Sequence, residues 1–200
     1  MKTFKCISAL FFLSFVFSPQ FSYSLENKLP GLTGGGIIGY FMPLNKDFHD
    51  FYGWGGLVSG LEASLRVLKF ADNVGLYAVG HYSFFNKSGR NNFGDDLEWK
   101  QSFLSFGGRS CVQINFIHIG LGLGLTQMRI TERFADYADY PEFNKSGLGV
   151  YMESVQRFRI YKFLQIGLNE KWDFKYMETD YKQLHVGGIA MFLGIYISAF

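Results

Sequence analysis

The sequence predicts an all-β protein: an eight-stranded antiparallel up-and-down transmembrane β-barrel that follows a cleavable signal peptide. Three observations support this prediction. Apolar and polar residues alternate over long segments, and short and long connections alternate between those segments. The composition combines 19% aromatic residues and 24 glycines with only 4 prolines. Few prolines favour long strands, because proline interrupts the hydrogen-bond ladder of a sheet.

The first 24 residues have the features of a secretory signal peptide. Lys2 and Lys5 precede an apolar run over residues 6–17, and Ser22 and Ser24 supply small residues for a cleavage site. The run of 12 residues is too short to span a bilayer as a helix. We therefore expect a signal peptide over residues 1–24 and one barrel domain over residues 25–200, with an uncleaved membrane anchor as the alternative.

The expected mature chain is electrically neutral and contains one cysteine. Removing Lys2 and Lys5 from 19 basic residues leaves 17, which equals the number of acidic residues. A neutral chain argues against nucleic acid as a partner, because binding to phosphates needs a basic surface. With Cys111 alone, no internal disulfide can form. Motifs for metal, nucleotide and dinucleotide sites are missing, so we predict no metal site and no cofactor.

Eight segments show the alternation of strands that have one apolar face. In the second segment, for example, Leu61 and Leu65 fall on one parity while Glu62 and Arg66 fall on the other. In the fifth, leucines alternate with glycines. The eight segments span residues 33–42, 54–68, 74–86, 97–111, 115–131, 147–160, 163–176 and 182–199.

The connections give the topology. Those near 69–73, 112–114 and 161–162 are short, whereas those at 43–53, 87–96, 132–146 and 177–181 are mostly longer and polar. Bacterial outer-membrane barrels have short periplasmic turns and longer extracellular loops. We therefore expect export through the periplasm and integral insertion in the outer membrane of a Gram-negative bacterium. A soluble lipocalin-like barrel is the alternative, although that fold turns its polar face outward.

Charged residues recur on the polar parity and are expected to face the lumen. An eight-stranded barrel is just wide enough for side chains to fill it, and charges buried there have to pair. We interpret the set as an ionic network that fills and rigidifies the lumen, with a narrow or gated solute path as the alternative. The network candidates are Glu62, Arg66, Arg109, Glu153, Arg157, Lys171 and Asp173.

Aromatic residues gather near the loop-side ends of the segments, where an aromatic girdle is expected at the membrane interface. These candidates are Trp54, Tyr82, Phe84, Trp99, Trp172 and Tyr176. The last strand is apolar on both parities, which predicts an apolar plug inside its periplasmic half.

Several segments resemble the eight-stranded outer-membrane β-barrel family that includes OmpX-like and OmpW-like proteins. They are GGGIIGYFMPL at 34–44, FHDFYGWGGLVSGLEASLRVL at 48–68, DNVGLYAVGHYSFFNKSG at 72–89, IHIGLGLGLTQM at 117–128, and the terminal Phe200, which resembles the assembly signal of such barrels. The resemblance covers essentially the whole mature chain. It implies a structural, surface-interaction or adhesion role, with a conduit for small hydrophobic solutes as the OmpW-type variant. The expected partners are outer-membrane lipids, lipopolysaccharide and the barrel-assembly machinery.

Two polar loops are the candidate surface for host or other surface ligands. Loop 132–146 combines acidic residues with tyrosines and a phenylalanine, and loop 87–96 carries Asp95 and Asp96. Loops of this composition bind sugars, cations or host proteins, or form a solvated rim without a ligand.

His81 and Ser83 form the candidate catalytic pair, because residues two apart in a strand share one face. An imidazole beside a hydroxyl supports acyl transfer. The pair resembles the start of the His-x-Ser-Asn motif of lipid A 3-O-deacylases, although Phe84 replaces the asparagine. The alternation points both side chains into the lumen, away from a lipid substrate. We therefore expect no catalytic site, with a lipid A-modifying enzyme as the alternative.

Overall fold

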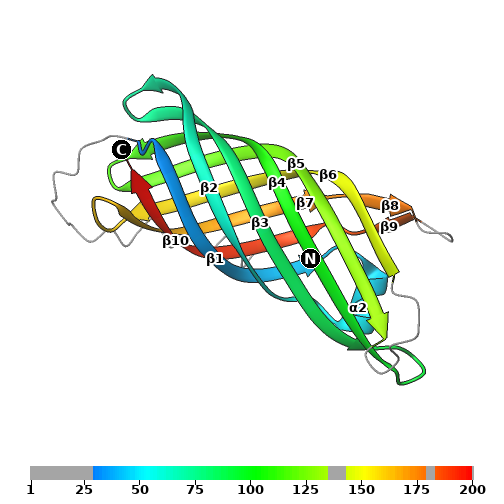
Figure 1. Cartoon of the computed structure of the whole chain (residues 1–200). Coiled ribbons are helices and arrows are strands. Elements are labelled where there is room, and N and C mark those ends of the chain that lie inside the picture. The colour runs from blue at the N-terminus through cyan, green and yellow to red at the C-terminus, as the bar shows by residue number, and fades with distance from the viewer. Residues whose placement is uncertain (1–28, 135–142, 179–182, 200) are drawn as a thin grey trace, which may run out of the picture.

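The computed structural model describes residues 29–134, 143–178 and 183–199. Eight antiparallel strands close into one barrel in the order β1-β10-β7-β6-β5-β4-β3-β2 (Figure 1). Pairing of Leu32 in the first strand with Ala199 in the last closes the ring. The expected fold class is therefore confirmed. The barrel strands are β1 (Leu32–Pro43), β2 (Gly56–Ala71), β3 (Val74–Arg90), β4 (Asp96–Ile114), β5 (Ile117–Phe134), β6 (Phe143–Arg159), β7 (Leu164–Phe174) and β10 (Gly188–Ala199).

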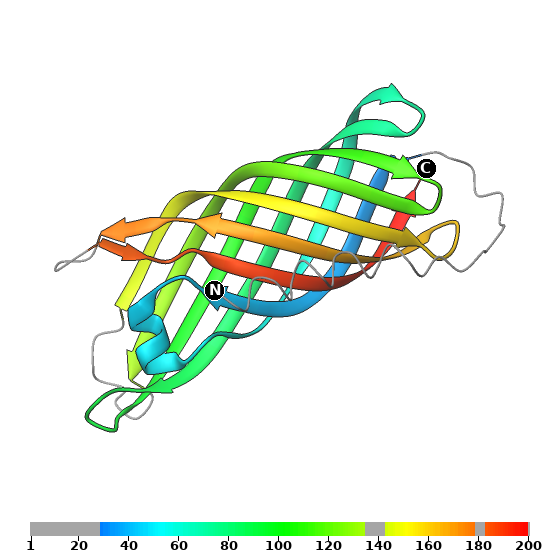
Figure 2. The same ribbon diagram turned by 180° about the vertical axis from the view of Figure 1, so that it is seen from behind.

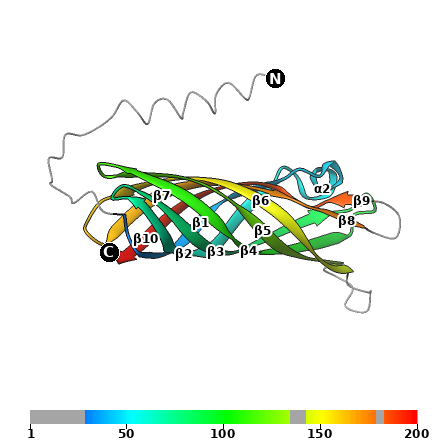
Figure 3. The same ribbon diagram turned by 90° about the horizontal axis from the view of Figure 1, so that it is seen from above.

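Three short elements lie together at one end of the barrel. They are α2 (Lys46–Tyr52), β8 (Tyr176–Glu178) and β9 (Gln183–His185), and the view from behind shows all three at the end away from the C-terminus (Figure 2). The short turns between β2 and β3, β4 and β5, and β6 and β7 lie at the opposite end. Seen from above, β8 and β9 continue past the ring as a small hairpin (Figure 3). The two ends therefore match the expected division into short turns and longer, elaborated loops.

Alternation along each strand separates an apolar outer face from a packed interior. On β5, Leu121 and Leu123 are 68% and 70% exposed, whereas Thr126 and Met128 are fully buried. The outward positions of the neighbouring strands are also mostly aliphatic or aromatic. An apolar face of this extent is expected to contact lipid, because water-soluble proteins seldom expose such large patches. No helix of the described residues is long and apolar enough to span a membrane.

Inward-facing glycines make room for long side chains that cross the lumen. The Tyr151 hydroxyl would lie 2.5 Å from a Cβ added at Gly107, and the Glu153 Cγ would lie 2.9 Å from a Cβ added at Gly122. A side chain at Gly122 would therefore require Glu153 to move, and at Gly107 the added Cβ would also clash with the Leu123 backbone oxygen. This packing explains the alternation of leucine and glycine along β5, in which the leucines face lipid and the glycines lie under crossing side chains.

The structure differs from the expected elements mainly at the loop-side ends. Residues 87–96 were expected as a loop, but Ser88 pairs with Glu98 and Arg90 with Asp96, so β3 and β4 continue into a long hairpin. The connection 43–53 contains α2. The last two expected segments are each interrupted, which separates β8 and β9 from the barrel. The expected signal peptide at 1–24 and the terminal Phe200 lie outside the described residues.

Candidate functional site

The lumen holds a network of buried charges centred on Glu62. The inward parity of β2, β4 and β6 brings Glu62, Arg109 and Arg157 to one level of the barrel. Arg109 Nη1 donates to Glu62 Oε1 at 2.6 Å, and Arg109 Nε donates to Glu153 Oε1 at 2.8 Å. Arg157 also forms an ion pair with Glu62, and the Asn169 amide donates to Glu62 Oε2 at 2.7 Å. One carboxylate therefore links side chains from four strands.

A second ion pair lies beside this network. Lys171 Nζ donates to both carboxylate oxygens of Asp173 at 2.9 and 3.0 Å and to the Ser105 hydroxyl at 2.8 Å. The ammonium also lies 4.9 Å from the centre of the Tyr151 ring. Together the two groups contain three acidic and three basic side chains, all of them buried: Glu62, Glu153, Asp173, Arg109, Arg157 and Lys171. This balance matters because an unpaired charge in a low-dielectric interior is strongly unfavourable.

Arg66 is the one predicted network residue that the structure places elsewhere. Its guanidinium donates to the backbone oxygen of Leu29 at 2.7 Å, and the Tyr77 hydroxyl donates to the backbone oxygen of Pro30 at 2.9 Å. Both bonds hold the segment before β1 across the periplasmic end of the barrel. Arg66 therefore fastens the N-terminal segment and is separate from the charges around Glu62.

An apolar cluster fills the lumen above the charges, on the side of the long loops. Phe41 contacts Phe85 and Phe103 edge to face, with 5.1 Å between ring centres in each pair. The wider cluster, which we call the plug, consists of Ile37, Phe41, Phe48, Tyr52, Val58, Phe85, Leu97, Trp99, Phe103, Met128, Ile130, Val186, Ala190, Phe192 and Tyr196. The apolar plug was expected in the periplasmic half of the last strand. That expectation is wrong for most of the cluster: among the described residues of that half only Tyr196 belongs to it, and the other aromatic side chains gather toward the loops.

The short helix α2 covers the plug. The Asn45 side chain caps its first turn by accepting from the Asp47 amide at 3.0 Å, and Gly53, with φ of 75°, ends it. The helix places Phe48 and Tyr52 inward, where their rings stack with 4.8 Å between centres. The Tyr52 hydroxyl donates to Glu132 Oε1 at 2.5 Å. Burial and the neighbouring carboxylate raise the pKa of Tyr52, so this hydroxyl remains a donor.

The structure places five of the six predicted interface aromatics outside the lumen and one inside it. Trp54, Tyr82 and Phe84 are exposed on the outside, and Trp172 faces outward with its indole nitrogen donating to Glu170 Oε1 at 2.9 Å. Tyr176 is exposed beyond the ring and lies against His185 in the β8–β9 hairpin. Trp99 differs from the expectation: it is only 5% exposed and packs inside the plug, with 5.3 Å between its ring centre and that of Phe48.

His81 and Ser83 both face the lumen and are almost fully buried. The His81 ring lies edge to face against Phe192, with 5.4 Å between ring centres. Neither ring nitrogen of His81 has a hydrogen-bond partner among the described residues. A nucleophile and its base are expected within about 2.6–3.2 Å of each other, and the described residues contain no such contact for this pair.

Replacement of Ser83 by alanine is therefore expected to leave lipid A unchanged. The hydroxyl is buried behind the barrel wall, so its loss removes no group that a lipid substrate can reach. The measurement is the mass profile of lipid A from cells that express the wild type, the S83A variant or no barrel. Deacylated lipid A in the wild type that disappears in S83A would establish the enzymatic alternative.

Sequence reasoning missed several of these contacts. Asn169 and Tyr196 complete the environment of Glu62, and Ser105 contacts Lys171. Asn169 and Ser105 lie on the same parity as charged residues of their strands, which is the signal that could have identified them. Tyr196 had no such signal, because β10 contains no charged residue. The plug gave a weaker signal, because apolar residues also occupy the outward positions of strands such as β1 and β10, where residue type alone does not separate the two faces.

Fold and lumen define a class: small closed β-barrels with the architecture of integral outer-membrane proteins. No family model and no curated protein matches the sequence. Solved structures do match. Neisserial surface protein A is similar with a TM-score of 0.64 and 9% identity over 84% of this chain and 97% of that chain. Outer-membrane protein OprG of Pseudomonas aeruginosa has a TM-score of 0.58 and 11% identity over 85% and 96%. At these identities, the comparisons confirm the eight-stranded outer-membrane barrel fold.

Proposed function

We propose that this protein is an integral barrel of the bacterial outer membrane that acts at the cell surface, as a structural, surface-interaction or adhesion protein without a catalytic site. The observation that carries this proposal is the distribution of polar groups in the described residues. The wall is apolar, the lumen is filled by the charge network and the plug, and exposed charges collect on the strand ends beyond α2.

The long hairpin of β3 and β4 is the main surface that carries these exposed charges. Its outer part carries an exposed ion pair in which Arg90 Nε contacts Asp96 Oδ1 at 2.9 Å. Nearby, Glu98 forms ion pairs with Arg133 of β5 and with Lys100. Exposed ion pairs contribute little to stability. The charges on this projection therefore support recognition more than folding.

Shortening this hairpin is expected to reduce surface binding without loss of the barrel. Deleting residues 90–96 joins Gly89 to Leu97, which face each other in the β3–β4 register, and keeps the plug residue Leu97. The measurement is adhesion of expressing cells to wells coated with extracellular matrix, with the protein level matched by outer-membrane fractionation. The control is K69E/D72K, which exchanges two charges in the periplasmic turn, away from the cell surface. Equal adhesion of all three proteins would contradict the surface role of the hairpin.

A conduit for small hydrophobic solutes is the second candidate function. It is favoured by one observation: the plug beneath α2 is lined by aromatic rings, and α2 is held over it by the bond between Tyr52 and Glu132. Movement of α2 would expose the apolar side chains of the plug to the outside. The charge network below the plug opposes transport, because it would have to open for a solute to pass.

A further inference from the structure

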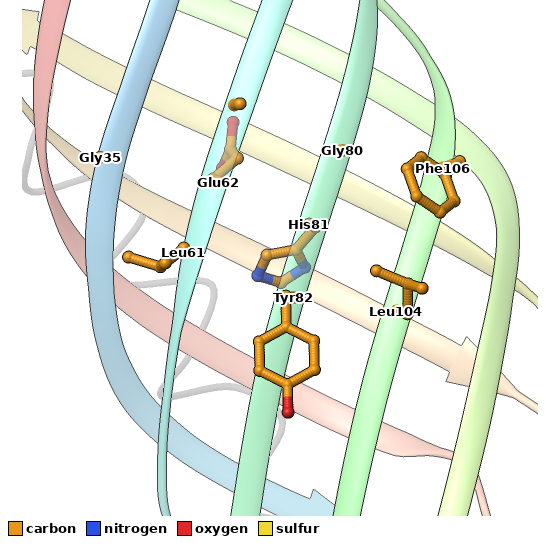
Figure 4. Close-up of a pocket in the computed structure, with 9 residues that line it drawn as sticks. Gly35, Leu61, Glu62, Gly80, His81, Tyr82, Leu104 and Phe106 are labelled. Carbon is orange, nitrogen blue, oxygen red and sulfur yellow. The ribbon is translucent and has the colours of Figure 1, made fainter.

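The lipid-facing wall of β2, β3 and β4 contains a hollow of about 520 Å³. Ala63 and Gly80, which face each other across β2 and β3, form its floor. Four larger side chains surround this floor: Leu61, Tyr82, Leu104 and Phe106. Figure 4 shows them around Gly80. All four are exposed on the outside of the barrel. The hollow therefore opens toward the membrane and is apolar.

Basic side chains lie beyond this hollow, toward the long loops. Arg129 lies on the outward parity of β5, four residues after Leu125, which pairs with Phe106 at the edge of the hollow. Four strand residues correspond to about 13 Å. Lys100 also faces outward, on the neighbouring strand β4. It lies two residues from Ser102, which pairs with Arg129. A line from the hollow toward the cell surface thus passes from apolar side chains to two cations.

These cations are only partly neutralised within the protein. Lys100 Nζ lies 3.2 Å from Glu98, which it shares with Arg133. Arg129 Nε donates to Asn144 Oδ1 at 3.3 Å, and among the residues that the structure describes Arg129 forms no ion pair. Two bases therefore share one acid, and Arg129 has an amide oxygen as its side-chain partner. At the same end of β1 and β10, the outward residues are Tyr40, Met42 and Ile189, so the basic character is local to this wall.

We propose that this wall binds a phosphorylated acyl lipid of the lipid A type from the outer leaflet. One acyl chain occupies the hollow over Gly80, and a phosphate binds Arg129 and Lys100. Arginine suits this contact because its planar guanidinium donates two parallel hydrogen bonds to phosphate. The inference rests on the proposed outer-membrane location and adds to it a defined lipid site.

Lipid retention by the purified barrel tests the site. The protein is reconstituted in phosphatidylcholine nanodiscs that contain a small fraction of bis-phosphorylated lipid A, and lipid that remains after detergent extraction is measured by native mass spectrometry. The variant K100A/R129A is expected to retain about tenfold less lipid A, since one charge-assisted hydrogen bond corresponds to about that factor. Replacing Gly80 by leucine fills the hollow and is expected to reduce retention to a similar extent.

Matched controls separate the site from general effects. A Cβ at Gly80 would meet the Phe106 ring at 3.6 Å, which is ordinary contact, so G80L is expected to fold. The control G36L adds the same side chain to an outward glycine of β1 that has nothing within 4 Å. The control K69A/K162A removes two exposed cations at the periplasmic end. Both controls are expected to retain lipid A as the wild type does, and heat-modified electrophoresis verifies folding of each variant.

Two further lipids identify the ligand. Lipid A without phosphates is expected to be retained weakly by the wild type, with no further loss in K100A/R129A. Phosphatidylglycerol is expected to be retained weakly by every variant. Unchanged lipid A retention in K100A/R129A or G80L overturns the proposed site, as does retention of phosphatidylglycerol equal to that of lipid A. A barrel that inserts in the nanodisc but retains no lipid A contradicts only this inference, whereas failure to insert contradicts the membrane location as well.

Discussion

Replacement of Glu62 by leucine is expected to destabilise the barrel by about 3–5 kcal/mol, because it leaves buried cations without their shared carboxylate. Arg157 would lose its ion pair with Glu62, and Arg109 would keep only Glu153. The Asn169 amide would lose its acceptor on Glu62 as well. The measurement is the urea dependence of folding in lipid vesicles, followed by the shift between folded and unfolded bands in electrophoresis.

Two matched variants distinguish charge from packing. The double variant E62L/R157L removes one charge of each sign and leaves the pair of Arg109 and Glu153, so we expect it to be more stable than E62L alone. Replacing Glu98 by leucine removes a carboxylate that also binds two cations, but in a partly exposed position at the strand ends, and is expected to change stability by less than about 1 kcal/mol. An E62L barrel as stable as the wild type would show that water, not Glu62, neutralises these arginines.

The alternation of residue types was sufficient to predict which charged residues face the lumen. Because strand residues point alternately to opposite faces, the parity that holds Glu62, Arg109 and Glu153 could be assigned to the lumen without a structure. The lumen charges are therefore identifiable from the sequence, although their pairing is not. Pairing depends on the stagger between strands, which brings Glu62 of β2 to Arg157 of β6 across the barrel.

Trp99 shows where residue type misled the prediction. It lies on the same parity as Gln101 and Arg109, which the structure places inward, yet its aromatic ring suggested the membrane interface. Parity was the stronger signal, because a change of face within a continuous strand requires a bulge. The helix α2 could not be predicted for a different reason. Its seven residues are too few to show a helical period, and its stability comes from packing on the plug.

Opening of the plug is expected to convert a closed barrel into a conducting one. The wild type should show no steady conductance in planar bilayers, because the aromatic rings of Phe41, Phe85 and Phe103 form a constriction that water does not wet. In the variant F41A/F103A these contacts are lost, and water is expected to reach the charge network from the loop side. Ion currents should then appear, since the network is polar and can be hydrated.

The outcome also separates the two functions proposed for the lumen. The control F84A/F106A removes two phenylalanines of the lipid-facing wall and is expected to stay closed, because neither ring lies in the lumen. A folded F41A/F103A barrel without conductance would mean that the ion pairs of Glu62 and Lys171 suffice to seal the lumen. Steady conductance of the wild type would contradict the closed lumen itself and would favour the conduit. The plug and the charge network thus lie in series along the lumen. Removing the plug shows whether the charge network alone stops ions.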